Sequence, residues 1–325
     1  MLPLPIFDYH RPRTLDEALG LLATLGPEAR IIAGGTDVLP NMKQGLFEPE
    51  HVVSVARLEE LRGIALVGDA LVVGAGMKLA EIAESILVQR AAPALAEAAG
   101  AVGGPHHRAM GTLGGNICLD TRCRYYNQTY FWRKALGFCL KKDGTVCHVV
   151  KGGAKCVAAA SNDSAPALIA LDAEIQILGK GGERRVPARD FYVADGIRNT
   201  VLEPGEIVVR VSVPVVAGRR SAFEKLRKRG AIDFPLLSVA ARIDAAGGRV
   251  TGADLVVSAL GARPRRIRAA AKVGPGTSAD RLPETLAQAA FAECKPLANL
   301  DDETEWRREM VPVVVKTAVR RALGG

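Results

Sequence analysis

The sequence predicts an α+β protein of two domains, one of which carries a long irregular insertion. Its 325 residues exceed one average domain, at about 100–200 residues each. Strand and helix patterns alternate over residues 1–116, whereas residues 117–160 follow neither period, and two strands followed by two long helices close the chain. We therefore expect a first domain at 1–216, with its insertion at 117–160, and a second domain at 217–325.

The first predicted helix begins at Thr14, where Thr14 and Glu17 fit a capping box, and it ends at Gly26-Pro27. A short apolar run at 30–33 then predicts a buried strand that stops at two glycines. Residues 217–220 (Ala-Gly-Arg-Arg) resemble a linker, which places the domain boundary near 216–220. The other expected strands are 52–55, 71–75, 174–178, 206–213, 238–243 and 250–258, and the other expected helices are 79–87, 93–100, 165–172, 282–293 and 302–323.

Composition excludes several classes of protein. With 48% hydrophobic and 24% charged residues, the chain is too apolar to be disordered. No apolar run approaches the roughly 18 residues of a membrane span. The first residues lack the basic and apolar regions of a secretory signal. Six cysteines are too sparse for a disulfide scaffold, so we expect a cytoplasmic protein with reduced thiols. We also expect no nucleic-acid partner.

Residues 117–160 form one basic, aromatic, cysteine-rich segment, called the insertion below. It holds six of the fifteen aromatic residues, and its eight basic residues against two acidic ones give +6 of the chain's net +8. Five of the six cysteines fall there: Cys118, Cys123, Cys139, Cys147 and Cys156.

Two glycine loops could bind phosphate. The first loop, Ile31-Ile32-Ala33-Gly34-Gly35-Thr36-Asp37, runs from a strand into two glycines. The second, Gly111-Thr112-Leu113-Gly114-Gly115-Asn116, likewise combines a glycine pair with a hydroxyl residue and an amide. Glycines let backbone amides approach a pyrophosphate closely. The alternative is that each loop is an ordinary turn before a helix. In the first loop, Thr36 or Asp37 would then be the N-cap of that helix. Neither loop matches the dinucleotide motif G-x-G-x-x-G.

The cysteine spacing favours a metal cluster. The last four cysteines of the insertion are separated by 15, 7 and 8 residues, without the close pair usual at zinc sites. Four thiolates spread over a loop could hold an iron–sulfur cluster, although the common ferredoxin spacings are absent. Buried core cysteines and redox-sensing thiols are the alternatives. His106, His107 and His148 are interpreted as loop histidines, and no acid–base pair suggests a catalytic residue.

These motifs resemble the FAD-binding medium subunit of the xanthine dehydrogenase family of molybdenum hydroxylases. Residues 33–37 resemble its first FAD loop and 112–117 its second, while Ser161-Asn162-Asp163 resembles its Ser-x-Asp segment. Phe223-Glu224-Lys225 and Asp233-Phe234-Pro235 resemble the start of its C-terminal domain. The likeness covers essentially the whole chain.

The insertion is the main departure from that family. Asn116 and Asp163 lie 47 positions apart, where most members have a much shorter connection. A cysteine-bearing insertion here resembles the β subunit of 4-hydroxybenzoyl-CoA reductase, through Asp120-Thr121-Arg122-Cys123, Cys139-Leu140-Lys141 and Cys147-His148-Val149. A periplasmic aldehyde oxidase group also carries a cluster in this subunit, with different cysteine spacing.

The resemblance implies the cofactors and the fold. Two α/β lobes would hold FAD up to about residue 216, and a C-terminal α+β domain would close over it. The insertion would carry a [4Fe-4S] cluster on Cys123, Cys139, Cys147 and Cys156, with no role assigned to Cys118. The residues implied to contact FAD are Ile31, Ile32, Ala33, Gly34, Gly35, Thr36, Asp37, Val102, Thr112, Gly115, Asn116, Asp163 and Lys225.

The resemblance also implies partners and a reaction. A large subunit would hold the molybdenum cofactor and the substrate, a small one would hold two [2Fe-2S] clusters, and the complex would be a dimer of heterotrimers. The expected reaction removes the phenolic hydroxyl of 4-hydroxybenzoyl-CoA reductively, as in aromatic degradation. The alternatives are a related hydroxylase that oxidises another aromatic, heterocyclic or aldehyde substrate, and a non-enzymatic iron–sulfur interaction module.

The charge of the insertion predicts a docking face for an acidic electron carrier, most simply a ferredoxin. Arg122 and Arg124 flank Cys123 and are expected to offset the negative charge of the cluster. The exposed charges are expected at Lys134, Lys141, Lys142 and Lys151.

Overall fold

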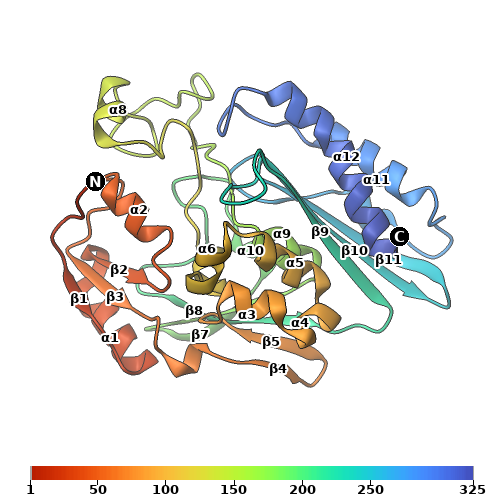
Figure 1. Cartoon of the computed structure of the whole chain (residues 1–325), viewed down its shortest axis with the longest axis horizontal. Helices are drawn as coiled ribbons and strands as arrows, with labels where there is room; N and C mark the ends of the chain where they lie inside the picture. The colour runs from red at the N-terminus through yellow and green to blue at the C-terminus, as the bar shows by residue number, and fades with distance from the viewer. Residues whose placement is uncertain (1, 325) are drawn as a thin grey trace.

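The computed structural model describes residues 2–324, and its N-terminal lobe is a small parallel sheet of order β1-β3-β2 (Figure 1). Thr14 caps the first helix as predicted, since its side chain accepts a hydrogen bond from the Glu17 amide. Gly26, at φ +59°, ends that helix. The elements are β1 (Asp8–His10), α1 (Leu15–Leu25), η1 (Gly26–Glu28), β2 (Ala29–Ile32), α2 (Val38–Lys43) and β3 (His51–Ser54).

The second lobe is a five-stranded antiparallel sheet of order β4-β5-β8-β6-β7. Its central strand β8 comes from beyond the insertion. The predicted helix at 79–87 is two helices, because Ser85 caps the second through the Val88 amide. The elements are η2 (Glu59–Leu61), β4 (Ile64–Val67), β5 (Ala70–Gly74), α3 (Leu79–Glu84), α4 (Ile86–Ala91), α5 (Pro93–Ala101), α6 (Pro105–Met110), α7 (Leu113–Ile117), α9 (Ser164–Ala170), β6 (Glu174–Gly179), β7 (Gly182–Pro187), α10 (Ala188–Phe191) and β8 (Ile207–Pro214).

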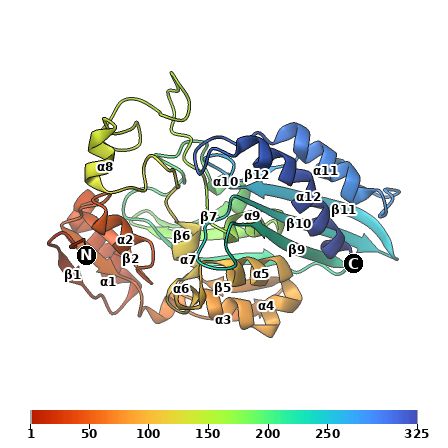
Figure 2. The same cartoon turned by 45° about the horizontal axis from the view of Figure 1, so that its top comes forward.

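The insertion leaves the second lobe and returns to it at one point. Arg122 and Ala159 pair through two backbone hydrogen bonds, of 2.9 and 2.7 Å, at its base. Most of the intervening chain is irregular, as predicted, and its helix α8 (Tyr130–Ala135) lies beside the N-terminal lobe in both views (Figures 1 and 2). Buried Arg133 anchors α8 there by donating to the carbonyl oxygen of Gly45 at 2.8 Å.

The C-terminal part is an antiparallel sheet of order β12-β11-β10-β9 with α11 and α12 over one face (Figure 2). Side chains of β10 alternate between two cores: Val239 packs with these helices and Ala240 with the second lobe. The linker predicted at 217–220 is wrong in its second half, because Arg219 and Arg220 begin β9. The elements are β9 (Arg219–Leu226), β10 (Leu237–Ala246), β11 (Arg249–Ser258), β12 (Arg265–Arg266), η3 (Ala270–Lys272), α11 (Leu282–Glu293) and α12 (Thr304–Leu323).

These layers confirm the predicted α+β class. No helix within residues 2–324 is both long enough and apolar enough to cross a bilayer.

Candidate functional site

The first glycine loop lies between β2 and α2 and packs directly against the second. Gly35 adopts φ +72°, in the left-handed region that favours glycine. A Cβ on Gly34 would stand 2.1 Å from the carbonyl oxygen of Met110, so only glycine permits this approach. A Cβ on Gly111 would lie 3.5 Å from Thr36 Oγ1. The structure therefore brings the two predicted loops into contact, with Ile31 and Ile32 at the end of β2 beneath them.

The second loop begins α7. Thr112 Oγ1 accepts a hydrogen bond from the Gly115 amide at 3.1 Å, so this amide already has an acceptor and part of the loop is an ordinary helix cap. At the other end of α7, Asn116 Oδ1 accepts from the amide of Ser164 at 3.0 Å and from its hydroxyl at 2.5 Å. Asn116 thereby fixes the second loop to the start of α9.

Asp163 and Lys225 form a buried ion pair beside this junction. Lys225 Nζ donates to Asp163 Oδ2 at 2.6 Å and to the carbonyl oxygen of Ala101, the neighbour of Val102, at 3.0 Å. Burial raises the pKa of Asp163 to about 6, although Lys225 and Arg227 act in the opposite direction. Asp163 Oδ1 is buried without a hydrogen-bond partner. The predicted residues Asp163 and Lys225 thus meet beside an unsatisfied acceptor, and Val102 follows the residue whose carbonyl oxygen Lys225 also binds.

The four cysteines predicted as cluster ligands line one cavity inside the insertion. Each is between 7% and 9% exposed, and each is a free thiol. Cys118 is exposed and does not line this cavity. The four lining cysteines are Cys123, Cys139, Cys147 and Cys156.

The family follows from comparison of the whole chain. The family described as "FAD binding domain in molybdopterin dehydrogenase" matches residues 5–216. The chain is a FAD-binding medium subunit of the molybdenum hydroxylase family. The family described as "CO dehydrogenase flavoprotein C-terminal domain" matches residues 221–322 of this medium subunit.

Its relatives span several dehydrogenases. The carbon monoxide dehydrogenase medium chain of Hydrogenophaga pseudoflava is 30% identical over 99% of this medium subunit and 98% of that protein. The aldehyde oxidoreductase FAD-binding subunit PaoB of Escherichia coli (strain K12) is 33% identical over 84% of this chain and 87% of that one. A solved structure of the Hydrogenophaga pseudoflava carbon monoxide dehydrogenase superposes with a TM-score of 0.81, at 29% identity and 99% coverage of both chains. Quinoline 2-oxidoreductase from Pseudomonas putida 86 gives 0.79, at 25% identity and 99% coverage of both.

FAD is therefore a cofactor of this medium subunit, and the geometry of the loops fits it. The absence of a side chain at Gly34 lets the two loops meet backbone to backbone, and glycine-rich backbone of this kind can bind a pyrophosphate. The orphaned Oδ1 of Asp163 can accept a hydrogen bond from a hydroxyl or amino group of a nucleotide. The individual FAD contacts predicted from the sequence remain proposals.

The four cysteines of the cavity are the donor set that an iron–sulfur cluster requires. Among residues 2–324, no three sulfurs of this cavity lie within 4.8 Å of one another. Sulfurs bound to a single zinc ion at about 2.3 Å would lie about 3.8 Å apart, so the present spacing is too wide for one zinc ion. Iron–sulfur clusters bind their thiolates on different irons and spread them farther. Burial, helped by the three neighbouring cavity cysteines, raises the pKa of the Cys123 thiol to about 12, although a backbone hydrogen bond from Tyr125 acts in the opposite direction. A bound metal would favour the thiolate form of this side chain.

Lys141 corrects one sequence prediction. Its side chain is only 5% exposed, so it is not a solvated charge. It lines the cysteine cavity, where its ammonium group lowers the pKa of the Cys156 thiol against a larger rise caused by burial. Conversely, Arg122 and Arg124, expected to face the cluster, have carboxylate partners in Asp37 and Asp302.

Two further residues of the cavity were missed. His148, interpreted as a loop histidine, lines the cavity, and its Nε2 lies 2.6 Å from the carbonyl oxygen of Phe138. Gly196 lies outside the insertion, yet a Cβ there would stand 2.7 Å from Cys156 Sγ. The sequence around Gly196 gives no signal of that contact, whereas His148 directly follows the predicted ligand Cys147 and could have been chosen.

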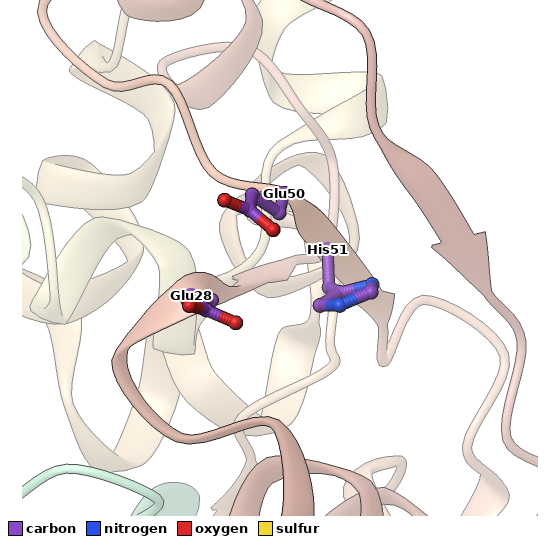
Figure 3. A group of neighbouring side chains, drawn as sticks. All are labelled: Glu28, Glu50 and His51. Atoms are coloured by element: carbon purple, nitrogen blue, oxygen red, sulfur yellow. The ribbon is translucent and has the colours of Figure 1, made fainter.

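The carboxylates of Glu28 and Glu50 converge with the ring of His51 on the N-terminal sheet, with ligand atoms within 4.8 Å (Figure 3). Both glutamates are exposed, and His51 is half-buried. Because exposed carboxylates often lie this close without a metal, we assign no site to this group.

Proposed function

We propose that this medium subunit transfers electrons through FAD and a [4Fe-4S] cluster in a 4-hydroxybenzoyl-CoA reductase. The observation that carries the cluster proposal is the convergence of four cysteines on one buried cavity. The insertion motifs around Cys123, Cys139 and Cys147 support the reductase. The net reaction would consume two electrons and two protons, release water and give benzoyl-CoA.

In this proposal the chain's own residues position the cofactors. The two glycine loops would hold the FAD pyrophosphate, and Asp163 would accept a hydrogen bond from the nucleotide. Asp37 in the first loop pairs with Arg122 at 3.1 Å, and Arg122 precedes the ligand Cys123, so one ion pair connects both sites. FAD, when bound, can exchange electrons with one-electron and two-electron partners. The substrate would bind on the large molybdenum subunit.

The proposed complex contains that large subunit and a small subunit with two [2Fe-2S] clusters, arranged as a dimer of heterotrimers. Electrons would arrive from a ferredoxin or a similar acidic carrier. The insertion supports a docking role, because Lys134, Lys151 and Lys155 are exposed and the helix that carries Lys134 also exposes aromatic side chains. Phe131 is 79% exposed and Trp132 is 40% exposed.

The second candidate is a related hydroxylase that oxidises its substrate and passes electrons outward. The names of the relatives favour it, since they include carbon monoxide, xanthine and aldehyde enzymes. A non-enzymatic iron–sulfur module does not account for the FAD-binding domain.

Single cysteine variants test the cluster. Cys139→Ser should lose iron and acid-labile sulfide, whereas Cys118→Ser should keep both, because Cys118 does not line the cavity. Retention in Cys139→Ser, or loss confined to Cys118→Ser, contradicts the ligand assignment. Assaying the purified complex for benzoyl-CoA formation with a low-potential dye, and for aldehyde, xanthine and carbon monoxide oxidation, separates the two candidate reactions.

A further inference from the structure

A buried lysine lines the cysteine cavity, and its ammonium group has three hydrogen-bond acceptors. Lys141 Nζ lies 2.7 Å from Asp120 Oδ1, 2.6 Å from Thr121 Oγ1 and 2.6 Å from the carbonyl oxygen of Gly196. An ammonium group has three N–H donors, and here each has an acceptor. The charge is therefore fixed in place and cannot swing toward solvent.

The acceptors of Lys141 are fixed in turn. The Thr121 hydroxyl donates to the Gly196 carbonyl oxygen at 2.7 Å, and Tyr126 donates to Asp120 Oδ2 at 3.0 Å. Gly196 packs on the sulfur of Cys156. Lys141 and Asp120 thus form an ion pair in which the lysine lines the cavity and the aspartate does not. Charges that are buried and held in place act more strongly than solvated ones.

We propose that Lys141 is a fixed positive charge that raises the reduction potential of the cluster, and that Asp120 opposes it. This inference rests on the proposed cluster. Adding an electron makes the cluster more negative, so a nearby cation favours the reduced form and a nearby carboxylate favours the oxidised one. Lys141 acts through the cluster and touches no substrate.

Opposite substitutions test the proposal in the purified complex. Lys141→Met should disfavour reduction about tenfold, which is a fall of 59 mV for a one-electron couple. Asp120→Asn should shift the potential upward. The measurement is a redox titration of the cluster followed by electron paramagnetic resonance. Lys142→Met is the matched control, because the side chain of Lys142 is 39% exposed. In this variant the equilibrium constant for reduction of the cluster should change less than twofold.

The outcomes separate the two levels of the proposal. A wild-type complex without iron and sulfide in this subunit refutes the cluster itself. If the cluster is present, an unchanged potential in Lys141→Met, or shifts of the same sign in both variants, overturns the role of Lys141. If Lys141→Met loses its cluster, Asp120→Asn alone decides: an upward shift supports the proposal and any other result overturns it.

Discussion

Gly196 lies so close to Cys156 that a Cβ built on the glycine would stand 2.7 Å from the cysteine sulfur. The same Cβ would lie 3.1 Å from the Ala158 amide nitrogen, so little room exists for an adjustment. We predict that Gly196→Ala displaces this sulfur and lowers the iron content of the purified subunit by at least half. Iron and sulfide analysis measures the effect.

Gly181→Ala is the control for this prediction, because a Cβ there meets nothing within 4 Å. Full iron content in a folded Gly196→Ala variant would show that Cys156 does not hold the metal at this position.

The contact between Gly34 and Met110 predicts a flavin-binding defect. Gly34→Ala places a carbon 2.1 Å from a backbone oxygen and must separate the two loops. We expect the variant to bind FAD at least tenfold more weakly, and Gly35→Val to do the same because of its positive φ. Fluorescence titration with FAD measures the affinity, and circular dichroism checks the fold. Gly20→Ala, in open space on α1, should bind FAD normally. Unchanged affinity in a folded Gly34→Ala chain contradicts the assignment.

The pKa of Asp163 predicts a pH dependence of stability. Burial raises this pKa from 3.8 to about 6, so between these values the folded chain binds a proton that the unfolded chain has lost. This carboxyl group therefore makes the free energy of unfolding fall as pH rises through that window, by up to about 3 kcal/mol.

Asp163→Asn should remove this slope. The variant leaves Lys225 beside a neutral amide at every pH, as the protonated wild-type carboxyl group does at pH 4, so the difference in pH dependence between the two proteins is diagnostic. Urea unfolding of the FAD-free protein at pH 4 and pH 6.5 measures it. Parallel pH profiles for the two proteins would show that Asp163 does not titrate in this range.

Exposed charge on the insertion predicts salt-dependent reduction. Lys134→Glu combined with Lys151→Glu reverses two exposed charges and should slow reduction by an acidic protein carrier severalfold at low ionic strength. Stopped-flow kinetics should show the defect shrinking as salt is added, while a small neutral dye reduces both proteins equally. Lys180→Glu makes the same kind of change outside the insertion and should have little effect. Equal slowing with carrier and dye would indicate damage to the cofactor instead.

Local patterns predicted the elements that depend on their own residues. The capped helix at Thr14 and the helix at 282–293 appear where expected, because caps and apolar spacing are written within each segment. Strand β9 was missed because its charged residues find partners elsewhere: Arg219 bonds to Asp244 on the next strand. A local stretch of sequence does not show a partner that lies on another strand.

The same limit explains the site. Spacing and resemblance singled out the four cysteines, and they do share a cavity. Lys141 looked like half of an exposed Lys-Lys turn, and its burial comes from Asp120, Thr121 and Gly196, of which the last lies 55 residues away. Long-range acceptors decided where that charge lies, and periodicity carries no information about them.

The double hydrogen bond between Arg122 and Ala159 has an evolutionary consequence. Because the two ends of the insertion meet at one pair of residues, the chain could be joined across that pair without changing the path of the backbone through the flavin lobes. A gene for a simpler flavin subunit could therefore acquire the segment in a single event and lose it as easily. Lineages with and without this branch can then share one ancestral scaffold, and the tree of this subunit need not follow the presence of the insertion.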